Sequence, residues 1–203
     1  MIQNIKALII NTACDITEVI AINNGDVFSM QENSKNKTSK VLFPLIESVL
    51  EQANLNQKDL DYLSCVIGPG SFTGIRIGVS VIRAMAYALN IKCVPVTYFD
   101  VLAYKIDGIR DFAIITDAGN GVSYVRFDGK EQVVRTSEAV DYFLSKGITI
   151  VTDNKSIEGK NVIYSGGDLL KAFCMSIEKA CDYEDLVPVY LRKPQVERKE
   201  GDL

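Results

Sequence analysis

The residues best placed to do chemistry in this sequence lie in the segment 68–78, which reads GPGSFTGIRIG. The segment joins the apolar run 65–67 to a long apolar stretch, over which we expect a helix at about 73–89. A strand, a glycine-rich turn and a helix N-terminus can form an anion cradle, because free N–H groups and the helix dipole point the same way. In the alternative interpretation the glycines let two backbones pass closely, and Ser71 or Thr73 only caps the helix.

The segment departs from three known chemical motifs. A P-loop ends in Gly-Lys-Ser/Thr, but Gly74 is followed by Ile75 and Arg76. A dinucleotide fingerprint would need glycine at position 73, and a nucleophile elbow around Ser71 would need glycine at position 69. We therefore assign the loop a structural role. Its residues are Gly68, Pro69, Gly70, Ser71, Phe72, Thr73 and Gly74.

Carboxylates are the next candidates for catalysis, because the chain contains no histidine. Histidine is the commonest general base and the commonest transition-metal ligand, so a metal site would be built from carboxylates and would suit magnesium. Asp15, Asp117 and Asp168 could serve a small magnesium-dependent phosphotransferase or ATPase with the glycine loop on phosphate. Asp117 follows an apolar strand and is the best of the three, although aspartate at a strand end is more often a turn residue.

The composition is that of a soluble globular protein, and it limits the partners that the chain can bind. Of 203 residues, 47% are hydrophobic and 24% are charged, and the formal net charge is −4. An acidic balance disfavours an autonomous RNA-binding module, which would usually carry a basic excess. Basic residues gather at 35–40 and 192–199, where we expect a solvated loop and a tail.

Targeting and redox signals are few. No run of 18 apolar residues is present, so we expect no transmembrane helix. Residues 1–11 read as a first strand and not as a signal peptide. The five cysteines include no CxxC motif and are expected to be buried, reduced thiols. We expect a cytoplasmic protein without membrane contacts.

The apolar periodicity predicts an α/β chain with two similar halves, divided near residue 106. In residues 1–106 it predicts strands at 6–10, 17–22, 26–30, 63–67 and 91–96, helices at 38–53, 73–89 and 98–104, and a polar loop at 31–40. In residues 107–203 it predicts strands at 112–115, 123–127, 132–136, 148–151 and 162–164, and helices at 137–146 and 168–180. Each half is predicted to begin with a meander of strands and to continue with alternating helices and strands. This repetition suggests a pseudo-symmetric pair of lobes.

The predicted helix over 73–89 carries more apolar surface than one sheet can cover. On a helical wheel its polar stripe spans about 60° and its apolar residues roughly 220°, whereas packing on one sheet needs about 100°. Each large aliphatic side chain left in water forgoes roughly 1.5–3 kcal/mol of stabilisation. Either the rest of the chain or another polypeptide covers the excess.

Two seams of this helix are candidates for a contact with a partner. One passes through Ile75, Val79, Ile82, Ala86 and Leu89, and the other through Ile77, Val81, Ala84 and Ala88. Arg76 and Arg83 flank the first seam, and arginine beside an aliphatic patch is typical of interfaces. We expect the first seam to be the interface.

Several segments together resemble one protein family. Segment 68–78 and the small-residue-rich helix after it resemble the signature of the bacterial TsaB family, also called YeaZ. Residues 7–13 look like its opening strand, and residues 40–46 look like its first helix with an internal proline. Residues 116–118 with 123–125, and residues 188–192, resemble its second-lobe strand motif and its C-terminal motif.

The resemblance implies an actin-like ATPase fold, also called the ASKHA or ribonuclease-H-like fold, with two lobes of mixed sheet plus helices. It implies a role in placing threonylcarbamoyl on the tRNA adenosine beside the anticodon, as a non-catalytic paralogue that dimerises with the catalytic subunit TsaD. A TsaE-type ATPase would dock on the pair, tRNA would be bound only through the complex, and the isolated chain could form a homodimer. The implied partner-binding residues are Leu42, Leu45, Ile46, Val49, Ile75, Arg76, Val79, Ile82, Arg83 and Ala86, with no catalytic residue, metal or cofactor.

The departures from the family pattern agree with a scaffold. The family's first strand usually ends in Asp-Thr, whereas this chain has Asn11-Thr12, and neutral asparagine is a weaker magnesium ligand. Family members often carry histidine near the start of the first helix, and TsaD binds metal through paired histidines. Neither has a counterpart in a chain without histidine.

Overall fold

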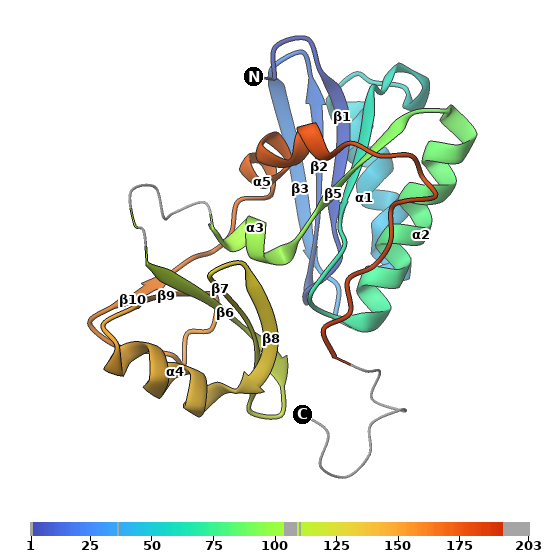
Figure 1. Cartoon of the computed structure of the whole chain (residues 1–203). Helices are drawn as coiled ribbons and strands as arrows, with labels where there is room; N and C mark the ends of the chain where they lie inside the picture. The colour runs from blue at the N-terminus through green and yellow to red at the C-terminus, as the bar shows by residue number, and fades with distance from the viewer. Residues whose placement is uncertain (1, 36, 104–108, 110, 193–203) are drawn as a thin grey trace. The chain divides into compact units, whose positions relative to one another are not determined.

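The computed structural model describes residues 2–35, 37–103, 109 and 111–192. The chain forms two compact units, and each contains one five-stranded sheet (Figure 1). Among the described residues, the first unit comprises those up to Tyr98 together with Leu169–Val189, and the second comprises those within Phe99–Asp168 together with Tyr190–Arg192. Residue 106 lies outside the described residues. The predicted contiguous second half is wrong, because the chain returns to the first unit after Asp168.

The sheet of the first unit has the strand order β3-β2-β1-β4-β5. Its strands are β1 (Lys6–Asn11), β2 (Ile16–Asn23), β3 (Asp26–Asn33), β4 (Tyr62–Val66) and β5 (Lys92–Val96). The first three pair antiparallel, as the Asn-Gly turn at 24–25 predicts, and β4 and β5 continue the sheet parallel to β1. β3 runs on to Asn33, where we expected a loop, because it pairs with the full length of β2.

Helices cover both faces of this sheet. α1 (Thr38–Gln52) packs on β2 and β3, and α2 (Phe72–Leu89) packs on β4 and β5. α5 (Leu169–Ser176) packs on β1 and β5, and the short turns η1 (Gln57–Asp59) and η3 (Ile177–Lys179) come after α1 and α5. Ala7–Asn11 of β1 are all buried, which requires cover on both faces of the sheet.

The second unit repeats the topology, with the strand order β10-β9-β6-β7-β8. Its elements are α3 (Tyr98–Leu102), β6 (Phe112–Gly119), β7 (Val122–Phe127), β8 (Lys130–Arg135), α4 (Thr136–Ser145), β9 (Thr149–Thr152) and β10 (Val162–Tyr164). β6, β7 and β8 form the antiparallel meander, and β9 and β10 run parallel to β6. α4 covers this sheet with Ala139 and Phe143 in a core shared with Ile115 and Val125.

The predicted α/β order of strands and helices is confirmed over the described residues, and the differences lie at element ends. The helix expected over 168–180 ends as α5 at Ser176, and the chain continues as the 3-10 turn η3. The helix expected over 98–104 is α3, which ends at Leu102, and residue 104 lies outside the described residues. Such shifts are expected because the apolar pattern fades at the ends of helices.

Candidate functional site at the glycine loop and the adjoining helix

At three glycines of the loop, the space that a side chain would need is occupied by the chain's own backbone. A side chain at Gly74 would overlap the carbonyl oxygen of Thr12, directly after β1. A side chain at Gly70 would likewise overlap the carbonyl oxygen of Ala13, and one at Gly68 would overlap the carbonyl oxygen of Val189. The loop therefore needs glycine because it wedges between the end of β1 and the C-terminal segment.

Hydrogen bonds within the chain occupy two backbone amides of the loop. The amide of Ser71 donates to the carbonyl of Ala13 at 2.7 Å. The amide of Gly74 donates to the hydroxyl of Ser71 at 3.2 Å, so Ser71 is the N-cap of α2. The hydroxyl of Thr12 donates to the carbonyl of Gly74 at 2.8 Å. These contacts make the turn a structural joint, since the Ser71 and Gly74 amides already have acceptors within the chain.

Asn11 occupies the end of β1, where the family usually has aspartate. Its side chain is 4% exposed, and its Oδ1 accepts a hydrogen bond from the amide of Ala13 at 3.0 Å. Its side-chain nitrogen, Nδ2, lies 3.8 Å from the sulfur of Cys14. The side chain thus shapes the turn that receives Ser71 and Gly70.

Two of the three carboxylates considered for magnesium, those of Asp15 and Asp117, have local roles. Asp15 is exposed and lies 3.5 Å from the ammonium of Lys35. Asp117 accepts a hydrogen bond from the amide of Gly119 at 3.1 Å, which is the turn role that aspartate commonly has at a strand end. The backbone amide of Asp168 donates to Val101 at 2.9 Å. Across the residues that the structure describes, no three cysteine, aspartate or glutamate side chains are grouped so that they could hold a metal ion.

The expected interface seam of α2 faces inward. Ile75, Val79, Ile82 and Ala86 are at most 3% exposed, because they form the contact of α2 with its own sheet. The same holds for Leu42, Leu45, Ile46 and Val49 of α1, which are at most 5% exposed. These apolar side chains are already buried within the unit, so the expectation that they bind a partner is not supported by exposed surface there.

The other seam of α2 lies at the surface. Ala84 and Ala88 are exposed and Ile77 and Val81 are half-buried. Tyr87 is 69% exposed and Arg76 is exposed, with its guanidinium 4.0 Å from the ring centre of Phe72. On α1, Phe43 is 53% exposed. α1 and α2 contact each other, and together they present a surface of small, aliphatic and aromatic residues, which we call the α1–α2 face.

Sequence reasoning missed the partners that the loop packs against. Ala13 and Val189 contact the loop from positions distant in the chain, and neither has a distinctive residue type. Only information on which distant residues contact each other could have revealed these two. Periodicity did find the helix and its excess apolar arc, but it could not orient that arc, because both seams are apolar.

The apolar composition of α2 raises the question of a membrane span. α2 is the one helix in the described residues that is long and apolar enough to cross a membrane, with a mean hydropathy of 1.3. The core helix of a globular protein passes the same test, and α2 packs on β4 and β5. This observation is weak evidence for a membrane span.

Comparison with known proteins shows which family the sequence matches and which proteins it is similar to. Residues 30–197 match the model of the family TsaD, tRNA N6-adenosine threonylcarbamoyltransferase. Over 98 residues the chain is 33% identical to tRNA threonylcarbamoyladenosine biosynthesis protein TsaB of Buchnera aphidicola subsp. Schizaphis graminum, which covers 48% of the chain and 47% of that protein. It is 30% identical to tRNA N6-adenosine threonylcarbamoyltransferase of Chlorobium phaeobacteroides over 47% of the chain and 31% of that protein. These alignments span about half or less of the relatives' length.

A solved structure shows the same fold along nearly the whole chain. The structure of YeaZ from Pseudomonas aeruginosa superposes with a TM-score of 0.71 at 21% identity, and covers 92% of this chain and 100% of that one. The actin-like arrangement of two mixed sheets with helices, expected from the sequence, is confirmed by this likeness.

Proposed function

Because the chain belongs to the TsaD family of tRNA N6-adenosine threonylcarbamoyltransferases, we propose that it acts in tRNA threonylcarbamoyladenosine biosynthesis as a non-catalytic subunit. In this role it is a cytoplasmic scaffold that activates a TsaD-type catalytic subunit by binding it. A TsaE-type ATPase docks on the pair, and tRNA is bound through the complex. The isolated chain can use the same surface to form a homodimer.

The filled glycine loop is the observation that carries the non-catalytic role. In an actin-like phosphotransferase, a loop between a strand and a helix would present free amides to a phosphate. Here the Ser71 and Gly74 amides bond within the chain, and carbonyl oxygens of Thr12 and Ala13 point at Gly74 and Gly70. Carbonyl oxygens repel a phosphate, so the arrangement favours a structural joint.

The α1–α2 face supports the binding role. Exposed alanines allow close approach of another helix, and the half-buried aliphatic residues beside them gain from the removal of water. Tyr87 and Arg76 flank this apolar strip, and both residue types are enriched at interfaces. We assign the contact with the catalytic subunit to this face, in place of the inward seam.

A bulky charged side chain in the centre of this face tests the proposal. Ala84→Arg should abolish co-purification with the TsaD-type subunit of the same organism and the threonylcarbamoyl transfer activity of the reconstituted complex. Its thermal stability should stay near that of the wild type, because Ala84 is exposed. Ser137→Arg, an exposed small residue on α4, is the matched control and should keep both properties. Intact binding and activity in Ala84→Arg would contradict the assignment.

The enzyme alternative is tested by calorimetry of the isolated chain with ATP and magnesium. We expect no heat of specific binding and no release of phosphate. Tight binding with turnover, abolished by Asp117→Asn, would instead make the chain a magnesium-dependent phosphotransferase or ATPase.

A further inference from the structure

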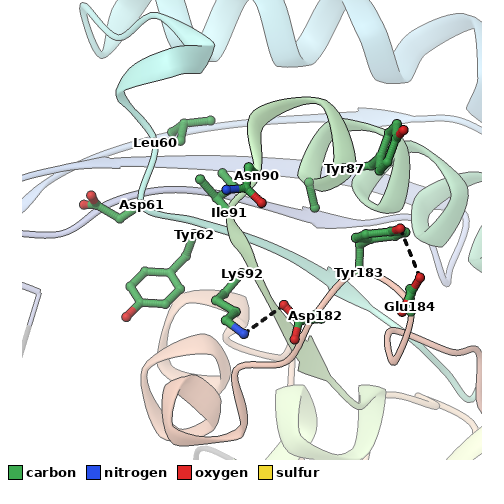
Figure 2. A pocket seen from close by; sticks show the side chains of 11 residues that line it. Leu60, Asp61, Tyr62, Tyr87, Asn90, Ile91, Lys92, Asp182, Tyr183 and Glu184 are labelled. Atoms are coloured by element: carbon green, nitrogen blue, oxygen red, sulfur yellow. Dashed lines mark hydrogen bonds and ion pairs between the residues drawn. The ribbon is translucent and has the colours of Figure 1, made fainter.

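A cavity of about 840 Å³ opens in the first unit at the end of α2 (Figure 2). β4 and β5 are parallel, so their first residues lie at the same edge of the sheet, and α2 ends at this edge too. The segment after η3 completes the wall with Asp182, Tyr183 and Glu184. The cavity thus combines three parts of the chain that are far apart in sequence.

The lining combines aromatic rings with an excess of negative charge. Tyr62, Tyr87 and Tyr183 supply the rings. Asp61, Asp182 and Glu184 supply three carboxylates, and among the described lining residues Lys92 supplies the one ammonium. The ammonium of Lys92 lies 2.8 Å from Asp182 and neutralises that carboxylate, so Asp61 and Glu184 keep the excess charge. Figure 2 shows these two at opposite ends of the cavity.

The end of α2 adds to the negative potential. A helix C-terminus carries a partial negative charge, which cationic side chains in the last turn usually offset. The last turn of α2 contains Ala86, Tyr87, Ala88 and Leu89 and no basic residue. Ala86 and Tyr87 line the cavity, as does the C-cap residue Asn90. The helix and the carboxylates would therefore favour a positive charge placed in the cavity, and the guanidinium of Arg83, which acts on Tyr183, opposes them in part.

Two of the rings are held in place beside one of the carboxylates. Tyr87 and Tyr183 pack edge to face with their ring centres 5.3 Å apart, and the hydroxyl of Tyr183 donates to Glu184 at 3.1 Å. A carboxylate has acceptor sites beyond the one that Tyr183 uses. A planar guanidinium can stack on a tyrosine face and hydrogen-bond to a carboxylate at once, which an ammonium does less well.

We infer that this cavity receives an arginine side chain of the TsaD-type partner, with the guanidinium on the ring of Tyr183 and hydrogen-bonded to Glu184. The inference rests on the proposed function, because it takes the TsaD-type subunit as the partner. Tyr87 connects the two sites, since it lies on the exposed side of α2 and also lines the cavity. A partner seated on the α1–α2 face would end at the mouth of the cavity. The excess of negative charge selects a cationic side chain, and the tyrosines select arginine over lysine.

The affinity of the purified chain for its TsaD-type subunit tests this inference. Glu184→Gln should weaken binding about tenfold at low salt and flatten the salt dependence of the affinity, because it removes a charge-assisted contact. Glu178→Gln, an exposed carboxylate on η3 outside the cavity, is the matched control and should bind as the wild type does. Equal affinities of Glu184→Gln and the wild type at both salt concentrations would overturn the inference.

A double-mutant cycle identifies the arginine. Each surface arginine of the partner is changed to alanine in turn, and one of them should lose about tenfold affinity for the wild-type chain but little for Glu184→Gln. Absence of any coupled arginine would overturn the cavity's role, while Ala84→Arg would still abolish binding. If Ala84→Arg binds normally, the proposed function fails instead, so the two failures are distinguishable.

Discussion

The two units share one sheet topology but differ in the connection after the fourth strand. In the first unit β4 leads through the glycine loop into α2, whereas in the second unit β9 leads through residues 153–161 directly to β10. Both units nevertheless contain a three-stranded antiparallel meander followed by two parallel strands. The first unit thus has a helix at the position where the second unit has a short irregular connection, and this helix buries one apolar seam on its own sheet and leaves the other at the surface.

The units also hold themselves together differently. The first unit joins distant segments by close backbone contacts at Gly68, Gly70 and Gly74. The second unit has an ion cluster, in which the guanidinium of Arg126 lies 2.6 Å from both Asp100 and Glu131 and 4.7 Å from the ring centre of Phe99. The close contacts of the first unit require glycine at three positions, whereas the cluster of the second unit requires charged side chains.

The largest effect should come from the glycine loop. Gly74→Ala places a methyl group against the carbonyl oxygen of Thr12, and backbone cannot move aside as a side chain can. We expect a loss of about 3 kcal/mol or more in the free energy of unfolding, measured with urea. In the second unit Gly166→Ala meets nothing within 4 Å and should change the value by less than about 1 kcal/mol. Similar losses for both variants would contradict the close-contact account.

A smaller effect is expected from the ion cluster of the second unit. Arg126→Gln leaves Asp100 and Glu131 without their guanidinium, and all three side chains are about a quarter exposed. We expect a loss of about 1–3 kcal/mol in the free energy of unfolding. Arg135 lies 3.7 Å from Glu138 on an exposed surface, so Arg135→Gln should cost less than about 0.5 kcal/mol. Equal costs would show that the cluster contributes no more than a surface pair.

The smallest effect is a pH dependence confined to the first unit. Ile10 and Cys65 close the parallel pair of β1 and β4, and Ile115 and Thr152 close the corresponding pair of the second unit. Burial raises the pKa of the Cys65 thiol well above its ordinary value of 9.0. The unfolded chain therefore loses this proton first, so its stabilising contribution is complete below pH 9 and is lost as the pH rises further.

The replacement Cys65→Thr copies the second unit and checks this dependence. The wild type should lose stability in thermal melts more steeply than the variant as the pH rises above 9, and the two should run parallel below it. Cys174→Ser, on α5, is the control for a half-buried thiol and should behave as the wild type does. Parallel curves for the wild type and Cys65→Thr above pH 9 would remove Cys65 as the cause.

The comparison of the units also shows how far sequence reasoning reached. Periodicity predicted the strands and helices of both sheets, because each burial pattern is local. It did not show that Leu169–Val189 returns to the first unit, since the segment carries no signal of the sheet on which it packs. It also favoured the seam of α2 that the structure buries, because Val79 and Val81 differ in position but not in residue type.

The sequence by itself determined the order of the elements, the structural turn at Gly68–Gly74 and the lack of a histidine for catalysis, because glycine spacing and composition are properties of the chain alone. Only the tertiary structure decided which face of α2 is left for a partner and that Tyr183 and Glu184 lie beside Tyr87. The reason is physical: burial and cavities arise between segments that are distant in the chain, and a local pattern does not encode which of them meet.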